Sequence, residues 1–163
     1  MRPGESTVYC IDTSSLINLH RWRPEREHVK VWGRLEDLIE KHRLLAPKKV
    51  LGELHRKSDV LPRWARGHKR MFKSISAESV ATLQQILKKF PGLVDQNRPD
   101  EVADPYVVAL ARQESRNTLG DEVVVVTDEK YAPGRPRIPH VCEAYRLKYL
   151  TIHQVFLFEG WDF

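Results

Sequence analysis

The sequence has few of the features that mark disulfide-stapled, zinc-binding or membrane proteins. Its 163 residues include two cysteines, Cys10 and Cys142, and no CxxC pair. This excludes a disulfide framework, and the seven histidines show no HExxH spacing that would favour a zinc site. Apolar runs such as Val123–Val126 and Val155–Phe158 are too short to cross a bilayer. Residues 1–7 also lack the apolar core of a signal peptide, so we expect a cytoplasmic protein with no membrane partner.

Repeats, low-complexity segments and linkers are also absent from the sequence. The ten prolines and eight glycines are spread along the chain, and 41% apolar content is enough for a substantial core. The length predicts a single domain over residues 1–163, with its core at about 8–158. The net charge of +5 and the pI near 9.3 favour a polyanionic partner.

Short β-rich runs alternate with amphipathic helical patterns along the chain. The predicted strands are Val8–Ile11, Leu44–Pro47, Val123–Val126 and Tyr149–Thr151. The predicted helices are Ser14–Trp22, His28–His42, Lys48–Lys57, Ala77–Phe90 after the N-cap Ser76, Asp104–Asn117, Ile138–Leu147 and Ile152–Phe158. Residues 95–101 and 131–139 are predicted to be irregular loops. This alternation predicts a three-layer α/β/α sandwich with a central parallel sheet, as in Rossmann-like folds.

Acidic residues follow two of the predicted strands and occur in two of the helices. Asp12 follows the first strand, and Asp128 and Glu129 follow the run of valines. The carboxyl ends of parallel strands meet at one edge of a sheet, so these acids can converge, and Glu53 and Asp104 can join them. Each acid alone has an ordinary explanation: Asp12 or Asp104 as a helix cap, Glu53 on a solvated face, Asp128 in a turn.

Four converging carboxylates would need a compensating charge. Two carboxylates about 5 Å apart repel by roughly 3 kcal/mol at an effective dielectric constant near 20. Such a cluster must take up protons or bind a cation. Oxygen ligands without sulfur or imidazole suit Mg²⁺ or Mn²⁺, which makes either ion the predicted cofactor.

Four stretches, in this order along the chain, resemble the motifs of PIN-domain nucleases. They are Ile11–Ile17, Val50–Leu54, Ala103–Ala111 and Val125–Asp128. Ile138–Glu143 is further similar to a PIN-like bacterial and archaeal subgroup of poorly defined function. The resemblance spans most of the chain. It implies a divalent-metal-dependent endoribonuclease that hydrolyses RNA phosphodiester bonds.

The same resemblance implies roles for particular residues. Asp12, Glu53 and Asp104 would form the acidic catalytic centre, with Asp12 and Asp104 among the metal ligands. The family's fourth acid usually stands two positions after the threonine, which is Glu129 here, whereas Asp128 stands one position after. Both Asp128 and Glu129 therefore stay candidates for the fourth catalytic and metal-binding position.

Two hydroxyl residues could support the predicted metal ligands. Ser14 and Thr127 stand beside the predicted ligands and could orient a water, a ligand or the phosphate. Equally ordinary roles are a cap or turn for Ser14 and a strand position for Thr127.

The family resemblance also implies an RNA substrate, an antitoxin partner if the protein is the toxin of a toxin–antitoxin pair, and a homodimer.

Basic residues outside the acidic cluster could bind the RNA backbone. Without Asp12, Glu53, Asp104 and Asp128, the chain has 18 acids against 27 bases. Phosphate contacts are predicted at Arg63, Arg66, Lys69, Arg70, Arg135 and Arg137. Trp64 and Phe72 lie within the basic stretch and could stack on an unpaired base, although their burial in the core is the more ordinary arrangement.

Two other functions fit parts of the sequence. A catalytically inactive RNA-binding or interaction module on the same fold would explain an acid displaced to Asp128. A phosphatase would also place an aspartate after the first strand, but it would normally show Asp-x-Asp where this chain has Asp12-Thr13-Ser14. We rank the metal-dependent ribonuclease first, the inactive module second and the phosphatase last.

Overall fold

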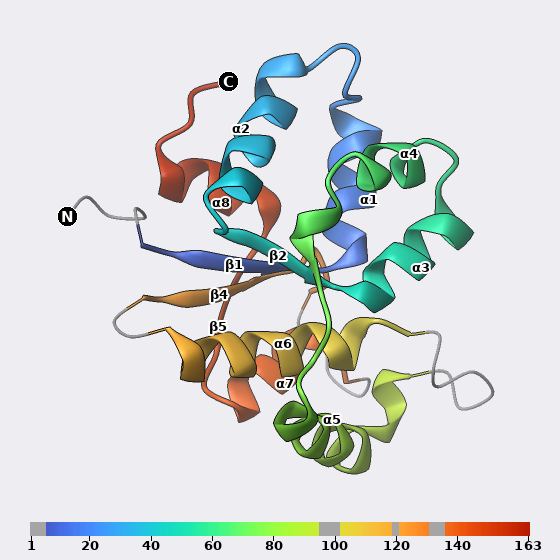
Figure 1. Ribbon diagram of the computed structural model, residues 1–163, viewed down its shortest axis with the longest axis vertical. Helices are drawn as coiled ribbons and strands as arrows, with labels where there is room; N and C mark the ends of the chain where they lie inside the picture. The colour runs from blue at the N-terminus through green and yellow to red at the C-terminus, as the bar shows by residue number, and fades with distance from the viewer. Residues whose placement is uncertain (1–5, 95–101, 119–120, 131–135) are drawn as a thin grey trace.

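A sheet of five parallel strands forms the centre of the computed structural model, which describes residues 6–94, 102–118, 121–130 and 136–163 (Figure 1). The strands are β1 (Val8–Ile11), β2 (Leu44–Pro47), β3 (Phe72–Lys73), β4 (Val123–Val126) and β5 (Lys148–Leu150), and their order across the sheet is β3-β2-β1-β4-β5. Each neighbouring pair is parallel. β3 was not predicted, because two residues are too few to show a strand period.

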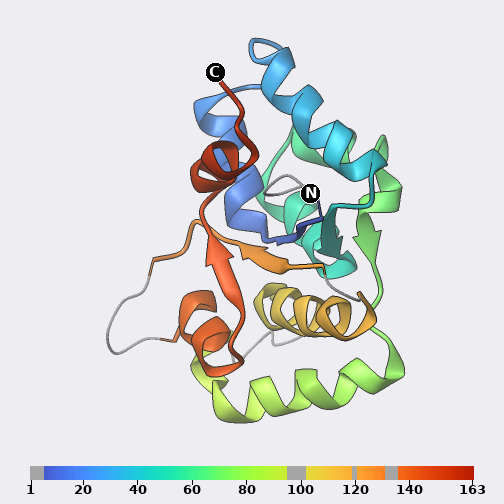
Figure 2. The same cartoon turned by 90° about the vertical axis from the view of Figure 1, so that its left-hand side faces the viewer.

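Helices cover both faces of this sheet. They are α1 (Thr13–Trp22), α2 (Val29–Glu40), α3 (Lys48–Lys57), α4 (Leu61–Arg66), α5 (Ala77–Lys89), α6 (Asp104–Asn117), α7 (Ile138–Ala144) and α8 (Ile152–Glu159), with short 3₁₀ turns η1 (Lys69–Met71) and η2 (Pro91–Leu93). In Figures 1 and 2, α5, α6 and α7 lie on one side of the sheet and α1, α2 and α8 on the other. The predicted three-layer α/β/α class is confirmed.

Buried apolar runs explain why the middle of the sheet is so deeply enclosed. All four residues of β1 and all four of β4 are buried, as expected for parallel strands covered on both faces. α6 buries the continuous run Val107–Ala111 against β1, β2 and β4. Because four of these five residues are valine or alanine, the helix can approach the sheet closely. This packing fixes the position of Asp104 at the start of α6.

The start of α6 differs by one residue from the prediction. The pair Asp104-Pro105 suggested an aspartate N-cap, but the structure places Ala103 at the cap and Asp104 in the first helical turn. No side chain caps this helix. The Asp104 carboxylate is therefore not occupied by a capping bond, whereas Ser76 accepts a hydrogen bond from the Ser79 amide as predicted for α5.

The strand order places a topological switch point between β1 and β4. From β1 the chain adds β2 and β3 on one side, and it later returns to add β4 and β5 on the other. Helices leaving β1 and β4 therefore diverge, which opens a crevice beyond the carboxyl ends of these two strands. Asp12 follows β1 and Thr127 follows β4 at this crevice. Within the described ranges, no helix is long and apolar enough to span a membrane.

Truncating Leu16, which is fully buried on α1, should lower the stability of the protein strongly. We expect Leu16→Ala to reduce the free energy of unfolding by about 2–5 kcal/mol, through lost burial and the remaining cavity. The same change at Leu157, which is 80% exposed on α8, should cost less than about 0.5 kcal/mol. Urea denaturation compares the two variants. Equal losses would contradict the placement of α1 in the core.

Candidate functional site

A cleft of about 680 Å³ at the switch point brings together side chains from distant parts of the sequence. Its described lining consists of Thr13, Ser14, Ile17, Asn18, Arg21, Glu53, Lys57, Leu93, Val94, Val102, Asp104 and Glu129. Three of these are acids, contributed by α3, α6 and the segment after β4. Asp12, which is 1% exposed, lies behind this lining at the end of β1. We call this hollow the acidic cleft.

The Asp12 carboxylate is held in place by three hydrogen bonds. Oδ1 accepts from the Ser15 amide at 2.9 Å, which makes Asp12 the N-cap of α1. Oδ2 accepts from the Ser14 hydroxyl at 2.8 Å and from the Thr127 hydroxyl at 2.6 Å. Burial raises the pKa of Asp12 from 3.8 to about 6, although the bonds from Thr127, Ser15 and Ser14 oppose this rise. Asp12 is therefore both a cap and a member of the acidic cluster.

Glu53 is buried on the inner face of α3 although it carries a carboxylate. It is 5% exposed and lies on the same helical face as the buried residues Val50 and Leu54. Its Oε1 accepts a hydrogen bond from the Thr13 hydroxyl at 2.6 Å, and its Oε2 lies 3.6 Å from Nζ of Lys57. The expectation of a solvated glutamate therefore does not hold for this side chain.

The carboxyls of Asp104 and Glu129 are close enough for each to affect the other. The pKa of Asp104 is raised well above its ordinary value, first by burial and then by the negative charge of Glu129. The charges of Asp12 and Glu53 raise it further. Because each of the other three acids disfavours ionisation of Asp104, the four carboxyls form one electrostatic cluster.

Asp128 points away from this cluster. Its Oδ2 accepts a hydrogen bond from Nδ2 of Asn18 at 3.1 Å, and its Oδ1 accepts one from the Ile152 amide at the start of α8 at 3.3 Å. Glu129 lines the acidic cleft and Asp128 does not. Alternation along an extended chain explains the difference, because neighbouring side chains point in opposite directions.

Thr127 connects the two strands that form the crevice. Its hydroxyl donates to Asp12 and accepts from the Glu129 amide at 3.1 Å, and its own amide donates to the Leu150 carbonyl. Glu129 is fixed further by the Ile138 amide, which donates to its Oε2 at 3.0 Å. The two hydroxyls singled out in the sequence, Ser14 and Thr127, therefore both contact Asp12.

Sequence reasoning missed three residues of the site. Thr13 binds Glu53, Asn18 binds Asp128, and Lys57 lies beside Glu53. Helical spacing could have found two of them. Asn18 lies four residues after Ser14 on the same face of α1, and Lys57 lies four residues after Glu53 on α3.

The acids have the chemistry of a metal site but are not arranged as a finished one. Among the residues that the structure describes, no three His, Cys, Asp or Glu side chains are grouped so that they could already hold an ion. A cation bound here would have to displace any proton that these carboxyls hold, and it would draw the carboxylates together.

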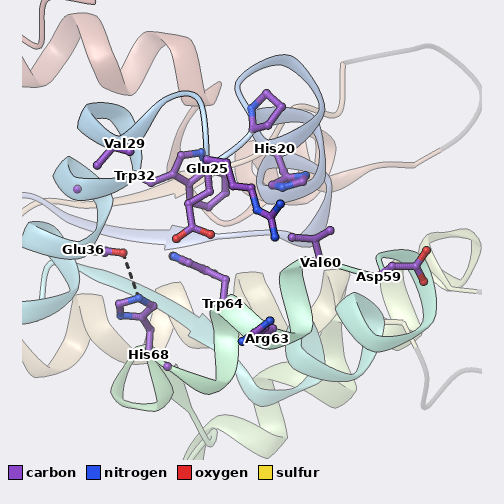
Figure 3. Close-up of a pocket in the computed structure, with 14 residues that line it drawn as sticks. His20, Glu25, Val29, Trp32, Glu36, Asp59, Val60, Arg63, Trp64 and His68 are labelled. Atoms are coloured by element: carbon purple, nitrogen blue, oxygen red, sulfur yellow. Dashed lines mark ion pairs between the residues drawn. The ribbon is translucent and has the colours of Figure 1, made fainter.

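The basic residues predicted to bind RNA lie elsewhere or point elsewhere. Arg63 lines a second cavity, of about 960 Å³, between α1, α2 and α4 (Figure 3). Arg70 pairs with Glu40 at 3.1 Å. Arg66, Lys69 and Arg137 are described, but none of these five cations lines the acidic cleft. Arg135 lies outside the described residues.

The two aromatic side chains of the basic stretch are buried. Trp64 is 6% exposed and Phe72 is 7% exposed, and Trp64 packs edge-on against Trp32 with ring centroids 5.1 Å apart. The more ordinary of the two predicted arrangements is therefore the one observed. These rings stabilise the core and offer little surface on which a base could stack.

Comparisons with known proteins connect the chain to one family and one solved structure. A family model described as "Domain of unknown function (DUF4411)" matches residues 9–163. The crystal structure of VapBC2 from Rickettsia felis, bound to a DNA fragment from their promoter, contains a chain that aligns with 17% identity and a TM-score of 0.46. The alignment covers 88% of this chain and 98% of that one. Likeness at this level assigns no activity or partner. No curated protein matches the sequence.

The raised pKa of Asp12 predicts that the metal-free protein loses stability as the pH rises. A carboxyl whose pKa is higher in the folded state binds its proton more tightly there, so its contribution falls from about pH 4 upward and levels off above about pH 6. The loss from Asp12 alone is on the order of 3 kcal/mol. Asp104 shifts in the same direction.

Asp12→Asn removes this ionisation and should therefore stabilise the protein at pH 8 but change little at pH 4. An asparagine amide could donate to the hydroxyls of Ser14 and Thr127 in place of their present bonds. Urea denaturation in EDTA at both pH values measures the effect. Asp37→Asn, the same change at an exposed position of α2, is the matched control. A variant less stable than wild type at pH 8 would refute the prediction.

Proposed function

We propose that this chain, which belongs to the DUF4411 family, is a divalent-metal-dependent endoribonuclease acting in the acidic cleft. The observation that carries the proposal is the convergence of Asp12, Glu53, Asp104 and Glu129 at the switch point of the sheet. A fold gains nothing in stability from several uncompensated carboxyls in one buried place. Their convergence is expected where carboxylates bind a cation.

The donor set fits Mg²⁺ or Mn²⁺. All four side chains offer carboxylate oxygens, which these hard cations prefer, and no imidazole or thiolate lines the cleft among the described residues. Asp12, Asp104 and Glu129 would hold the ion, with Glu53 beside them. When bound, the ion would make a water more nucleophilic and offset the charge on the scissile phosphate.

The chain's own residues prepare this arrangement. Ser14, Thr127 and the Ser15 amide fix the orientation of Asp12, and Thr13 fixes Glu53. Because the pKa of Asp104 is raised, any proton on this carboxyl would have to leave as the cation binds, since a ligand carboxylate must be ionised. Metal binding should therefore strengthen as the pH rises, in the direction opposite to the stability of the metal-free protein.

Asp104→Asn should abolish RNA cleavage that depends on Mn²⁺ or Mg²⁺. We expect a loss of more than about 100-fold, since removal of groups that merely support a metal ligand can already cost 10–100-fold. The assay follows a labelled RNA by gel, and urea denaturation checks that the variant is folded. Mn²⁺ should also raise the melting temperature of the wild type more than that of the variant.

Equal cleavage by wild type and Asp104→Asn would reject the nuclease proposal. RNA binding without metal-dependent cleavage by the wild type would instead support the inactive RNA-binding module. The role as a toxin with an antitoxin partner, and the homodimer, stay predictions from the family resemblance.

We also propose Glu129 as the fourth acid, because it lines the acidic cleft and Asp128 does not. Glu129→Gln should weaken Mn²⁺ binding and cleavage by at least about tenfold, because its carboxyl lies in the cleft beside Asp104. Asp128→Asn, the neighbouring matched change, should leave most activity. It should instead cost about 1–3 kcal/mol of stability through its bonds to Asn18 and α8. Isothermal titration with Mn²⁺ compares the two variants, and the reverse ranking would assign the position to Asp128.

A further inference from the structure

The second cavity, between α1, α2 and α4, is separate from the acidic cleft. None of its described lining residues is shared with that cleft, and the proposed reaction does not use it. Its volume of about 960 Å³ falls in the range of sites that bind small molecules. Two apolar side chains on its lining, Val29 and Val60, are 70% and 50% exposed. The cavity therefore offers both space and uncovered apolar surface to a ligand.

A glycine in the middle of α2 forms part of the cavity wall. Glycine is less favourable than alanine inside a helix, because its backbone loses more freedom on folding. Apart from the backbone of its own helix and its two neighbours, no heavy atom of the described chain lies within 4 Å of the place where a Cβ of Gly33 would stand. Packing within the protein therefore does not require glycine here. A flat ligand ring that lies directly against α2 would require it.

Two polar groups on the cavity lining have no partner in the described part of the chain. Nε1 of Trp64 is buried and donates no hydrogen bond there, which is unfavourable for an N–H group. The Glu25 carboxylate likewise forms no hydrogen bond or ion pair there. Figure 3 shows the indole nitrogen of Trp64 on the side of the cavity where the Glu25 carboxylate lies. Together they offer a planar ligand one donor and two acceptors.

Guanine has the edge that complements this set. Its O6 accepts a hydrogen bond, and the N1–H and N2–H groups beside O6 donate two. Nε1 of Trp64 would donate to O6, and the two carboxylate oxygens of Glu25 would accept from N1 and N2. Adenine has a donor, N6, where guanine has O6, so it would leave the Trp64 N–H group unpaired. Hypoxanthine differs from guanine only by the missing N2 donors.

Two arginines of the cavity can bind a phosphate group. Arg26 and Arg63 are exposed, and neither side chain forms an ion pair or hydrogen bond within the described ranges. A guanidinium group binds phosphate through two parallel hydrogen bonds. Of the other two acids on the lining, Glu36 pairs with His68 at 3.2 Å, and Asp59 points outward in Figure 3. Neither acid therefore occupies the arginines.

We propose that the second cavity binds a free guanine nucleotide. The base lies flat against α2 at Gly33, with its hydrogen-bonding edge on Trp64 and Glu25. The phosphate binds Arg26 and Arg63. This site does not depend on the proposed function, because it uses none of the residues of the acidic cleft.

Isothermal titration of the full chain with nucleoside 5′-monophosphates tests the site. We expect guanosine monophosphate (GMP) to bind with a Kd below about 1 mM. The inosine and adenosine monophosphates should each bind at least about tenfold more weakly, because each fails to pair one of the groups on the lining. Equal binding of the guanosine and adenosine nucleotides would overturn the assignment of the base.

Glu25→Gln should remove the preference for GMP over the inosine nucleotide. The glutamine amide keeps one acceptor and places a donor against the donors of guanine, so only the guanosine nucleotide loses a hydrogen bond. Glu27→Gln, the same change at an exposed position two residues later, should keep the preference of the wild type. A loss of stability alone would lower the affinity for both nucleotides together and leave their ratio unchanged.

Gly33→Ala should make the protein more stable and the ligand weaker. The methyl group should raise the melting temperature, because alanine favours the helix, and weaken GMP binding at least about tenfold, because it occupies the place of the ring. Gly52→Ala is the matched control in α3, where the added Cβ would meet only Nη1 of Arg56 at 3.6 Å. It should also raise the melting temperature, but GMP should bind as it does to the wild type.

A guanine base could also come from the end of an RNA chain, so a short RNA ending in guanosine is titrated into Asp104→Asn in EDTA. Binding of this RNA without binding of GMP would overturn the free nucleotide as the ligand. No GMP binding up to about 1 mM, or unchanged GMP affinity in Gly33→Ala, would overturn the site itself. None of these measurements involves cleavage, so their failure would leave the nuclease proposal standing.

Discussion

The parallel pairing of β1 with β4 is the constraint on which the site depends. Ile11 lies opposite Val126, and the Asp12 amide donates to the Val126 carbonyl at 2.9 Å. Asp12 and Thr127, which follow this pair of residues, therefore lie side by side. The Thr127 hydroxyl donates to the Asp12 carboxylate although the two residues are 115 positions apart in the sequence. A slip in this register would separate them, because successive side chains point to opposite faces.

This register also explains why the acids converge from different directions. The switch point opens a crevice only between β1 and β4, and α1 and α6 both begin beside it. α6 is anchored by its buried run Val107–Ala111, which fixes the height of Asp104 above the sheet. Glu53 reaches the same place from α3 and bonds to Thr13, the residue after Asp12. Asp12, Glu53 and Asp104 are thus positioned by helices and strand ends, and Glu129 is positioned by the segment that follows β4.

The sequence was most informative where local patterns act alone. Runs of strand formers predicted β1 and β4 at their observed bounds, and the N-cap Ser76 predicted the start of α5. It was least informative where the outcome depends on a side chain's direction. Asp128 and Glu129 are adjacent acids of equal chemistry, and only their surroundings separate them: Asp128 bonds to Asn18, whereas Glu129 lines the acidic cleft. A basic stretch at residues 63–73 looked like an RNA surface, yet its aromatics are core residues and its cations avoid the cleft.

The distribution of charge around the cleft is hard to explain by stability alone. Asp12 and Asp104 have raised pKa values, so their ionised forms are destabilised in the folded protein at neutral pH. Lys57 forms an ion pair with Glu53, with 3.6 Å between Nζ and Oε2, but its side chain is 57% exposed. The four carboxyls are therefore only partly compensated by the positive charge beside them. A divalent cation would complete this compensation, and this is the physical reason for proposing a metal ion in the acidic cleft.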